Sequence, residues 1–346
     1  MGKKIEFDFN DFELDEIPSE SAIVESWDED IDSPLVSILC VTYNHVQFIE
    51  SAFRGFLCQQ TTFPFEIVVH DDASDDGTTE IVKSYAERYP KIIKPIIQKH
   101  NQYSKGKFPT PLSLPYLLGK YVAMCEGDDF WLSKSKLQKQ VELLEQNPKS
   151  VMSGHITYTF HMNNETLVDN QWTDKLLINQ NWECDLVKLS KMHTSSLVLR
   201  KQELEESIEQ LGDFPSSDAA IRFLMSIKGG VIYIPDAMSV YRKGVENSWT
   251  IRIRDIKYAE SNFKSQMEFL NHLEVVAGVR NKKRIKKIKE SQVFSMLYVL
   301  RIHNDFFGYG KLACNSVNLF NPKSFVKLFL LAAVGSKKYS LLLGNI

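Results

Sequence analysis

Three apolar runs, each ending in a polar turn, organise the first part of this chain. They are Leu35–Val41 (L-V-S-I-L-C-V), Phe65–His70 (F-E-I-V-V-H) and Tyr121–Cys125 (Y-V-A-M-C). Continuous apolar runs of this length are typical of parallel strands that are covered on both faces. A further strand is predicted at Ile92–Gln98, although Pro95 weakens it.

Between these runs, apolar residues recur at the spacing of amphipathic helices. One helix is expected to begin near His45 with Asn44 as its N-cap, and another to begin near Thr78 and to stop before Pro90. A third is predicted at Ser133–Gln146. The alternation of strands and helices predicts a parallel sheet with right-handed crossovers.

The pattern is weaker in the second half of the chain. Strands are predicted at Val151–Phe160, Ser195–Leu199 and Val231–Ile234, and a helix at Asp218–Lys228. Residues 252–303 have a helical pattern. This half therefore adds elements to the sheet and ends in a helical segment.

Length and composition allow one large domain with appendages, because the chain has 346 residues of which 43% are hydrophobic. The net charge of −3 conceals an asymmetry: residues 1–33 hold 12 acidic side chains and two lysines, whereas residues 280–346 hold 13 Lys/Arg and two acidic side chains. We expect an acidic, mobile or peripheral N-terminal arm at 1–33, an α/β domain at 34–250 and a helical extension at 251–346.

The number and spacing of the cysteines indicate structural thiols in a reducing compartment, because the number is odd and no pair has metal-ligand spacing. They are Cys40, Cys58, Cys125, Cys184 and Cys314. Met1–Asn10 lacks the apolar segment of a signal peptide. No run reaches the roughly 18 apolar residues of a membrane span. The expected location is cytoplasmic.

The chemistry is concentrated where the strand at Tyr121–Cys125 ends in Glu126, Gly127, Asp128 and Asp129. Glycine allows a turn there, and ligands of open α/β sheets bind outside the carboxyl ends of the strands. Paired carboxylates are hard oxygen ligands that suit Mg²⁺ or Mn²⁺ holding a substrate diphosphate. The alternative is a solvated Asp-Asp turn without a ligand.

Three sequence segments, each a predicted strand with the turn after it, together resemble glycosyltransferase family 2. They are V-S-I-L-C-V-T-Y-N, E-I-V-V-H-D-D-A-S-D-D-G-T and G-K-Y-V-A-M-C-E-G-D-D-F-W. Their order and spacing make the match specific. The resemblance covers Pro34–Arg242 and implies the α/β GT-A fold, a mostly parallel Rossmann-like sheet flanked by helices. The acidic arm and the basic C-terminal extension lie outside it.

The resemblance implies a nucleotide site for UDP-sugar. Tyr43 would stack on the pyrimidine, with Thr42 and Asn44 beside it in the same loop. Asp72 would accept the uracil N3–H, and Asp128 would hold the ribose.

The resemblance also implies the catalytic groups. Asp129 would bind Mn²⁺ or Mg²⁺, which stabilises the negative charge of the leaving diphosphate. Asp218 would be the base, although Ser217 precedes it where the family often has Glu; the alternative is that Asp218 only caps its helix. Arg242 would contact the diphosphate or an acceptor phosphate, and His193 and Trp131 would line the acceptor pocket; the alternative for all three is a structural role.

The basic C-terminal extension has two interpretations. Seven of the ten residues Arg280–Lys289 are basic, and apolar patches follow at Phe325–Val334 and Tyr339–Leu343. One interpretation is a solvated helical face, and the other is docking on an anionic membrane. Nucleic acid is not an expected partner, because no recognition motif accompanies the charge.

The resemblance thus implies an inverting glycosyltransferase of hexosyltransferase type, which moves a sugar from a UDP-sugar to a hydroxyl of a lipid-linked glycan acceptor in bacterial polysaccharide synthesis. Its expected place is the inner face of the plasma membrane. The alternative is a non-catalytic nucleotide-sugar-binding subunit of a glycan assembly complex. A nucleotidyltransferase is disfavoured because V-T-Y-N-H is not a triphosphate loop, and no G-x-G-x-x-G of a dehydrogenase follows Leu35–Val41.

Overall fold

The fold is described from a computed structural model. It describes residues 3–5, 16–28, 33–169, 177–179, 192–212, 214, 217–246, 252, 255–276, 282–321 and 324. The described residues up to Lys243 form one compact unit, and those from Gly244 onward form a second.

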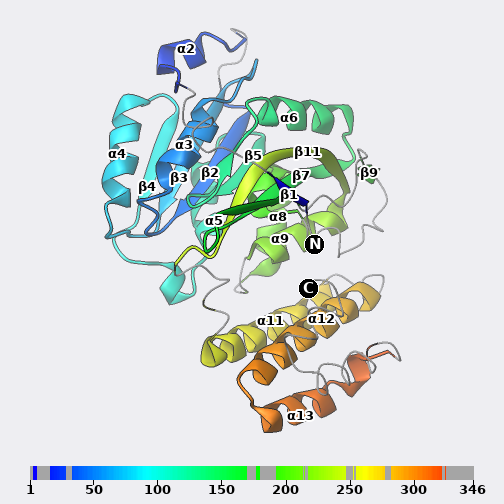
Figure 1. Cartoon of the computed structure of the whole chain (residues 1–346). Helices are drawn as coiled ribbons and strands as arrows, with labels where there is room; N and C mark the ends of the chain where they lie inside the picture. The colour runs from blue at the N-terminus through cyan, green and yellow to red at the C-terminus, as the bar shows by residue number, and fades with distance from the viewer. Residues whose placement is uncertain are drawn as a thin grey trace. The chain divides into compact units, whose positions relative to one another are not determined.

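The first half of the larger unit is a parallel sheet with the order β4-β3-β2-β5, as Figure 1 shows. The strands are β2 (Val36–Thr42), β3 (Phe65–Asp71), β4 (Ile93–Ile97) and β5 (Tyr121–Glu126). Each confirms a predicted strand, with ends that move by one residue. All residues of β3 are buried, as expected of a strand that is covered on both faces.

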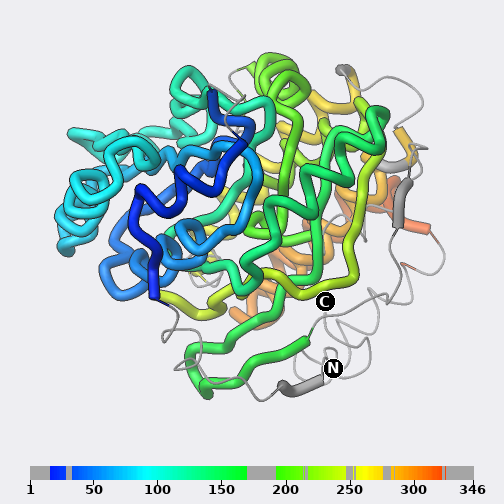
Figure 2. The backbone as a smooth tube through the Cα atoms, turned by 90° about the horizontal axis from the view of Figure 1, so that it is seen from above, coloured from blue at the N-terminus to red at the C-terminus, as the bar shows by residue number. Residues whose placement is uncertain are grey.

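The second half continues the sheet with strands of mixed direction. β10 (Val198–Arg200) pairs antiparallel with β5, and β7 (Ser150–His161) pairs antiparallel with β10. β11 (Gly230–Lys243) runs parallel to β7 at its side (Figure 2). The prediction of a mostly parallel sheet is thus an approximation that applies best to the first half.

Four shorter strands extend these pairs. β8 (Thr166–Asp169) pairs with β7, and β1 (Lys3–Ile5) pairs with β8. β6 (Phe130–Trp131) and β9 (Leu177–Asn179) both pair with β11. β6 directly follows the Asp128-Asp129 turn, so its pairing with β11 attaches that turn to the second half of the sheet.

Helices with one apolar face cover the sheet. They are α3 (Ile49–Leu57), α4 (Thr78–Arg88), α6 (Lys136–Gln146), α8 (Lys201–Leu211) and α9 (Asp218–Lys228). A short α5 (Pro109–Ser113) precedes β5. α9 has the predicted bounds, and the buried positions of α3 follow the helical spacing that we expect of a helix on a sheet.

The expected N-cap of the first helix is wrong. α3 begins at Ile49, with Phe48 as its N-cap and no side-chain cap. Asn44 instead has a positive φ of 56°, which asparagine tolerates better than most residues. Its side chain bonds to Asp75 in the loop after β3. Asn44 therefore joins two loops.

The N-terminal segment 16–28 packs on the larger unit, which corrects the expectation of a peripheral arm there. Its short α2 (Glu20–Val24) places Ile23 in the core. Trp27 lies edge-on to Phe65, with 5.5 Å between ring centroids. Among the described residues, this segment is thus part of the folded domain.

The second unit is helical, as predicted. It contains α11 (Ile256–Val276), α12 (Lys282–Ile302) and α13 (Phe306–Asn315). No helix within the described residues is both long enough and apolar enough to cross a membrane. The apolar patches Phe325–Val334 and Tyr339–Leu343 lie outside the described residues.

Candidate active site

Three loops leave the sheet at one edge. In the parallel register Thr42 of β2 lies opposite Asp71 of β3, and Val41 lies opposite Glu126 of β5. The amide of Asp72 donates to the carbonyl of Thr42 over 3.0 Å, so the second loop starts beside the first. The residues that follow the three strands, which we call the sheet-edge site, therefore lie around one place, as the sequence predicted.

The first loop presents an open aromatic ring. Tyr43 is 42% exposed. The amide of Asn44 donates to the Ser74 hydroxyl over 2.9 Å, and its side-chain amide donates to Asp75 over 2.9 Å. The loop after β3 thus holds the backbone on the C-terminal side of Tyr43 while the ring stays accessible.

The acidic residues of the second loop have separate roles. Asp71 accepts hydrogen bonds from Ser74 and from the Thr79 hydroxyl, and Asp76 accepts from Thr78. These contacts tie the loop to the start of α4.

Asp72 points elsewhere. Its two carboxylate oxygens accept hydrogen bonds from the backbone amides of Gln102 and Tyr103, over 2.7 and 3.0 Å. Asp72 is buried, and it therefore anchors the loop that precedes α5 at the sheet-edge site.

The turn after β5 requires glycine at position 127. A Cβ there would lie 2.7 Å from the Thr42 hydroxyl oxygen and 2.9 Å from Thr42 Cβ. This close approach holds the turn against β2. The Asp128 carboxylate consequently lies 3.9 Å from His45 Nε2, and the Asp128 carbonyl accepts a hydrogen bond from Arg242 over 2.8 Å.

Arg242 positions the turn through its backbone as well. Its amide donates to Asp129 Oδ1 over 2.9 Å. Its guanidinium lies over the Phe130 ring, 4.4 Å from the centroid, and is buried. These contacts explain how β11 sets the orientation of Asp129. The contact of Arg242 with a phosphate stays a prediction.

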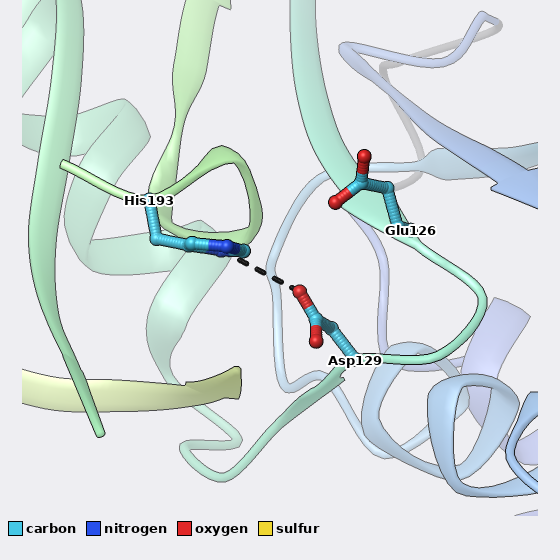
Figure 3. A group of neighbouring side chains, drawn as sticks. All are labelled: Glu126, Asp129 and His193. Atoms are coloured by element: carbon cyan, nitrogen blue, oxygen red, sulfur yellow. Dashed lines mark ion pairs between the residues drawn. The ribbon is translucent and has the colours of Figure 1, made fainter. Parts of the chain in front are cut away.

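Asp129 is fully buried, and its second oxygen, Oδ2, has no hydrogen-bond partner in the described structure. That oxygen lies 3.4 Å from His193 Nδ1. Figure 3 shows the Glu126 carboxylate on the other side of the same small space. Ligand atoms of Glu126, Asp129 and His193 all lie within 4.8 Å of one another.

The electrostatics of this group suit a cation. Burial, with Asp128 and Glu126 nearby, raises the pKa of Asp129 well above its usual range. Burial, with Asp128 and Asp218 nearby, raises the pKa of Glu126 to about 8. Burial, with Arg222 nearby, lowers the pKa of His193 to about 4, so the imidazole is neutral near pH 7. Arg222 and Arg242 offset the effect on Glu126 and Asp129 only in part, and carboxylates crowded in this way favour a bound cation.

The donor set fits a divalent metal. Two carboxylates and a neutral imidazole are ligands of Mn²⁺ and related ions, and the unpartnered oxygen of Asp129 faces the other two groups. His193 Nδ1 accepts a hydrogen bond from the amide of Ser195, so a cation at this nitrogen would take the place of that contact. Asp129 was the predicted metal ligand. Glu126 and His193, which the sequence did not predict as ligands, lie beside it in the folded structure.

A buried chain of hydroxyl groups lies behind His193. Its Nδ1 is 3.0 Å from the Ser195 hydroxyl, which donates to the hydroxyl of Ser239 over 3.1 Å. Ser239 in turn lies 3.0 Å from the hydroxyl of Thr157. The ring also stacks on Tyr241, with 4.2 Å between centroids. The orientation of His193 is thus set by β7 and β11.

Asp218 lies at the same site and does not cap α9. Ser217 is the N-cap, because its side chain accepts a hydrogen bond from the amide of Ala220. The Asp218 carboxylate accepts a hydrogen bond from Thr194 over 3.0 Å and pairs with Arg222 at 3.0 Å. Burial opposes its ionisation, but Arg222 and the Thr194 hydroxyl outweigh this effect and lower the pKa of Asp218.

Trp131 has the structural role that was the alternative to lining the acceptor pocket. Its side chain is buried, and its indole N–H donates to the carbonyl of Ser195 over 2.9 Å. Trp131 is thus a core residue that joins β6 to the segment after His193. Sequence reasoning noted His193 but expected it near an acceptor, because nothing in its local pattern shows that it meets Asp129.

Comparisons with known proteins agree with this geometry. The model of the family described as glycosyl transferase family 2 matches residues 37–206. The uncharacterized protein Rv1520 of Mycobacterium tuberculosis is 30% identical over 221 residues, which are 62% of this chain and 60% of that protein. The match therefore spans less than two thirds of that relative.

Another relative has a described activity. The Escherichia coli protein WfgD, named as a UDP-Glc:alpha-D-GlcNAc-diphosphoundecaprenol beta-1,3-glucosyltransferase, is 30% identical over 139 residues. These residues are 40% of this chain and 51% of WfgD.

Solved structures share the fold. Staphylococcus aureus TarS 1–349 in complex with UDP-GlcNAc aligns with a TM-score of 0.56 at 15% identity, over 90% of this chain and 92% of that one. The mannosyltransferase PcManGT of Pyrobaculum calidifontis, in complex with GDP-Man and Mn²⁺, aligns with a TM-score of 0.50 at 16% identity, over 93% and 91%. At such identities the likeness shows the fold, which is GT-A.

Proposed function

Because residues 37–206 of this chain are a glycosyltransferase family 2 domain with the GT-A fold, we propose that the protein is an inverting glycosyltransferase. It transfers a sugar from a UDP-sugar to a hydroxyl of a glycan acceptor. One observation carries the proposal: the loops after β2, β3 and β5 meet the group of Glu126, Asp129 and His193 at one edge of the sheet.

The nucleotide occupies the side of the site formed by the first two loops. The exposed ring of Tyr43 is a surface on which uracil stacks, with Thr42 and Asn44 beside it. Asp72 accepts the uracil N3–H through a lone pair that the amides of Gln102 and Tyr103 leave open. Asp128 holds the ribose.

Asp129, His193 and Glu126 hold a divalent cation, Mn²⁺ or Mg²⁺. When bound, such an ion binds the diphosphate and stabilises the charge that develops on it. PcManGT, which shares the fold, is in complex with Mn²⁺, and the ligand types here also suit this ion.

Asp218 is the base. Its lowered pKa keeps the carboxylate ionised at neutral pH, ready to take the proton of the acceptor hydroxyl. The acceptor oxygen then forms a bond to the anomeric carbon while the bond from that carbon to the diphosphate oxygen breaks. One displacement inverts the anomeric centre, and UDP leaves.

The acceptor is a lipid-linked glycan of a bacterial surface polysaccharide. The name of WfgD describes a transfer to a sugar on diphosphoundecaprenol, and this relative supports the same acceptor class here. An enzyme with such an acceptor works at the inner face of the plasma membrane, as a peripheral protein.

A donor screen tests the proposal. The purified full-length chain is incubated with Mn²⁺ and a panel of nucleotide sugars, and released UDP is measured. We expect release from a UDP-sugar, no release with EDTA, and loss of release in Asp129→Asn. Binding of a UDP-sugar without turnover under any acceptor condition would instead support a non-catalytic nucleotide-sugar-binding subunit.

A further inference from the structure

Two adjacent phenylalanines are exposed at the start of α13 in the C-terminal unit. Phe306 is 61% exposed and Phe307 is 84% exposed. Two more exposed apolar side chains, Tyr298 and Ile302, belong to the last turns of α12, which lead directly to this point. Exposed aromatic residues of this kind, gathered in one place, mark an interaction surface.

The exposed face of α12 continues from these residues toward its start. Residues three or four positions apart lie on one face of a helix. The exposed residues at this spacing are Lys283, Lys287, Ser291, Ser295, Tyr298 and Ile302. The opposite face buries Val293, Leu297 and Leu300 in the core of this unit. The exposed stripe is thus basic at one end and apolar at the other.

The charge of this segment is almost entirely positive. Residues 282–321 contain eight Lys/Arg and two acidic residues, Glu290 and Asp305. Both acidic side chains have internal roles, because Glu290 bonds to Ser324 and Asp305 caps α13. Arg301 lies over the ring of Phe306, 4.8 Å from the centroid, and Lys311 is exposed on α13.

We infer that this face, the exposed stripe of α12 with Phe306 and Phe307, docks on an anionic lipid bilayer. The lysines lie at the level of the lipid phosphates, and the two phenylalanines enter the boundary of the acyl chains. A second copy is a poor occupant, because two such basic faces repel each other. The inference adds a docking surface to the proposed function, but its physical basis is independent of sugar transfer.

Flotation with vesicles tests this inference on the full chain. Vesicles of phosphatidylcholine alone are compared with vesicles in which one third of the lipid is phosphatidylglycerol. We expect binding to the anionic vesicles only, weakened by added salt because the attraction is screened. Phe306→Ser with Phe307→Ser is expected to weaken binding by about tenfold or more. Lys283→Gln with Lys287→Gln is expected to weaken it by about thirtyfold.

A matched control removes another exposed apolar side chain. Leu118, in the larger unit, is 65% exposed, and Leu118→Ser is expected to bind vesicles like the parent. A thermal unfolding transition like that of the parent is the criterion that each variant is folded. The inference is overturned if the parent does not bind anionic vesicles, if both double variants bind like the parent, or if the face instead mediates self-association that the phenylalanine variant abolishes. None of these outcomes depends on UDP release, so the proposed function is tested separately.

Discussion

At the scale of single residues, the sheet-edge site is marked by buried polar atoms that lack hydrogen-bond partners in the described structure. Three of them are Asp129 Oδ2, the Thr42 hydroxyl oxygen and His45 Nδ1. Leaving such an atom unsatisfied costs about 1–3 kcal/mol. Similar atoms occur away from this site, for example Lys136 Nζ, so it is the position of these three around one turn that supports the proposed binding of a ligand there.

Asp218→Asn tests the base. Asparagine keeps the size of the side chain but cannot take a proton, so we expect turnover to fall by about 10²–10⁴-fold. Binding of UDP, measured by calorimetry, is expected to change little, because the proposed nucleotide site is formed by the first two loops. Asp236→Asn is the matched control, since Asp236 is an exposed aspartate that pairs with Lys139. Unchanged turnover in Asp218→Asn would remove this residue from the mechanism.

At the scale of elements, close backbone contacts place the helices on the sheet. Gly55 of α3 faces β6, and a Cβ there would lie 2.8 Å from both the amide nitrogen and the carbonyl oxygen of Trp131. A helix residue larger than glycine therefore forces α3 away from β6. Since β6 follows the Asp128-Asp129 turn, this contact also supports the site.

Gly55→Ala is accordingly expected to destabilise the protein by about 1–3 kcal/mol, because overpacking is relieved only by moving backbone. Urea unfolding measures the change. The same substitution at Gly310 of α13 is the control, because a Cβ there meets no atom within 4 Å. It is expected to be neutral or to add up to about 1 kcal/mol, since alanine favours helix more than glycine does. Equal midpoints for Gly55→Ala and the parent would contradict the packing argument.

At the scale of the whole molecule, one buried amine couples stability to pH. Lys136 is fully buried, and its Nζ lies 3.9 Å from the centroid of the Trp131 ring without a hydrogen-bond partner. Burial lowers the pKa of Lys136 from 10.5 to about 7. Between these two values the unfolded chain holds a proton that the folded chain has released.

The free energy of unfolding therefore contains a contribution that rises as pH increases from 7 to 10.5 and is constant below pH 7, where both states are protonated. One proton corresponds to a slope of about 1.4 kcal/mol per pH unit. Lys136→Met removes this contribution. Urea unfolding at several pH values between 7 and 10 is expected to give a flatter slope for the variant than for the parent. Parallel curves would show that Lys136 is not the coupled group.

The sequence by itself determined the elements of the first half and the residues at their ends. Continuous apolar runs and the glycine at position 127 are local signals, so β2, β3 and β5 and the loops after them were predicted to within about a residue. In this way the sequence placed Asp72 directly after β3, and Asp128 and Asp129 in the turn after β5. The bounds of α9, and hence the place of Asp218 at its start, were also predicted, because helical spacing is local.

Only the tertiary structure decided which distant residues meet. β10 pairs between β5 and β7, and this arrangement brings His193 to Asp129. β11 places the amide of Arg242 on the same carboxylate. The tertiary structure also decided that Trp131 is a core residue and that Asn44 bridges two loops instead of capping a helix. The physical reason is that strand order and burial are set by contacts between segments far apart in the chain, and a local pattern of apolar and polar residues does not record them.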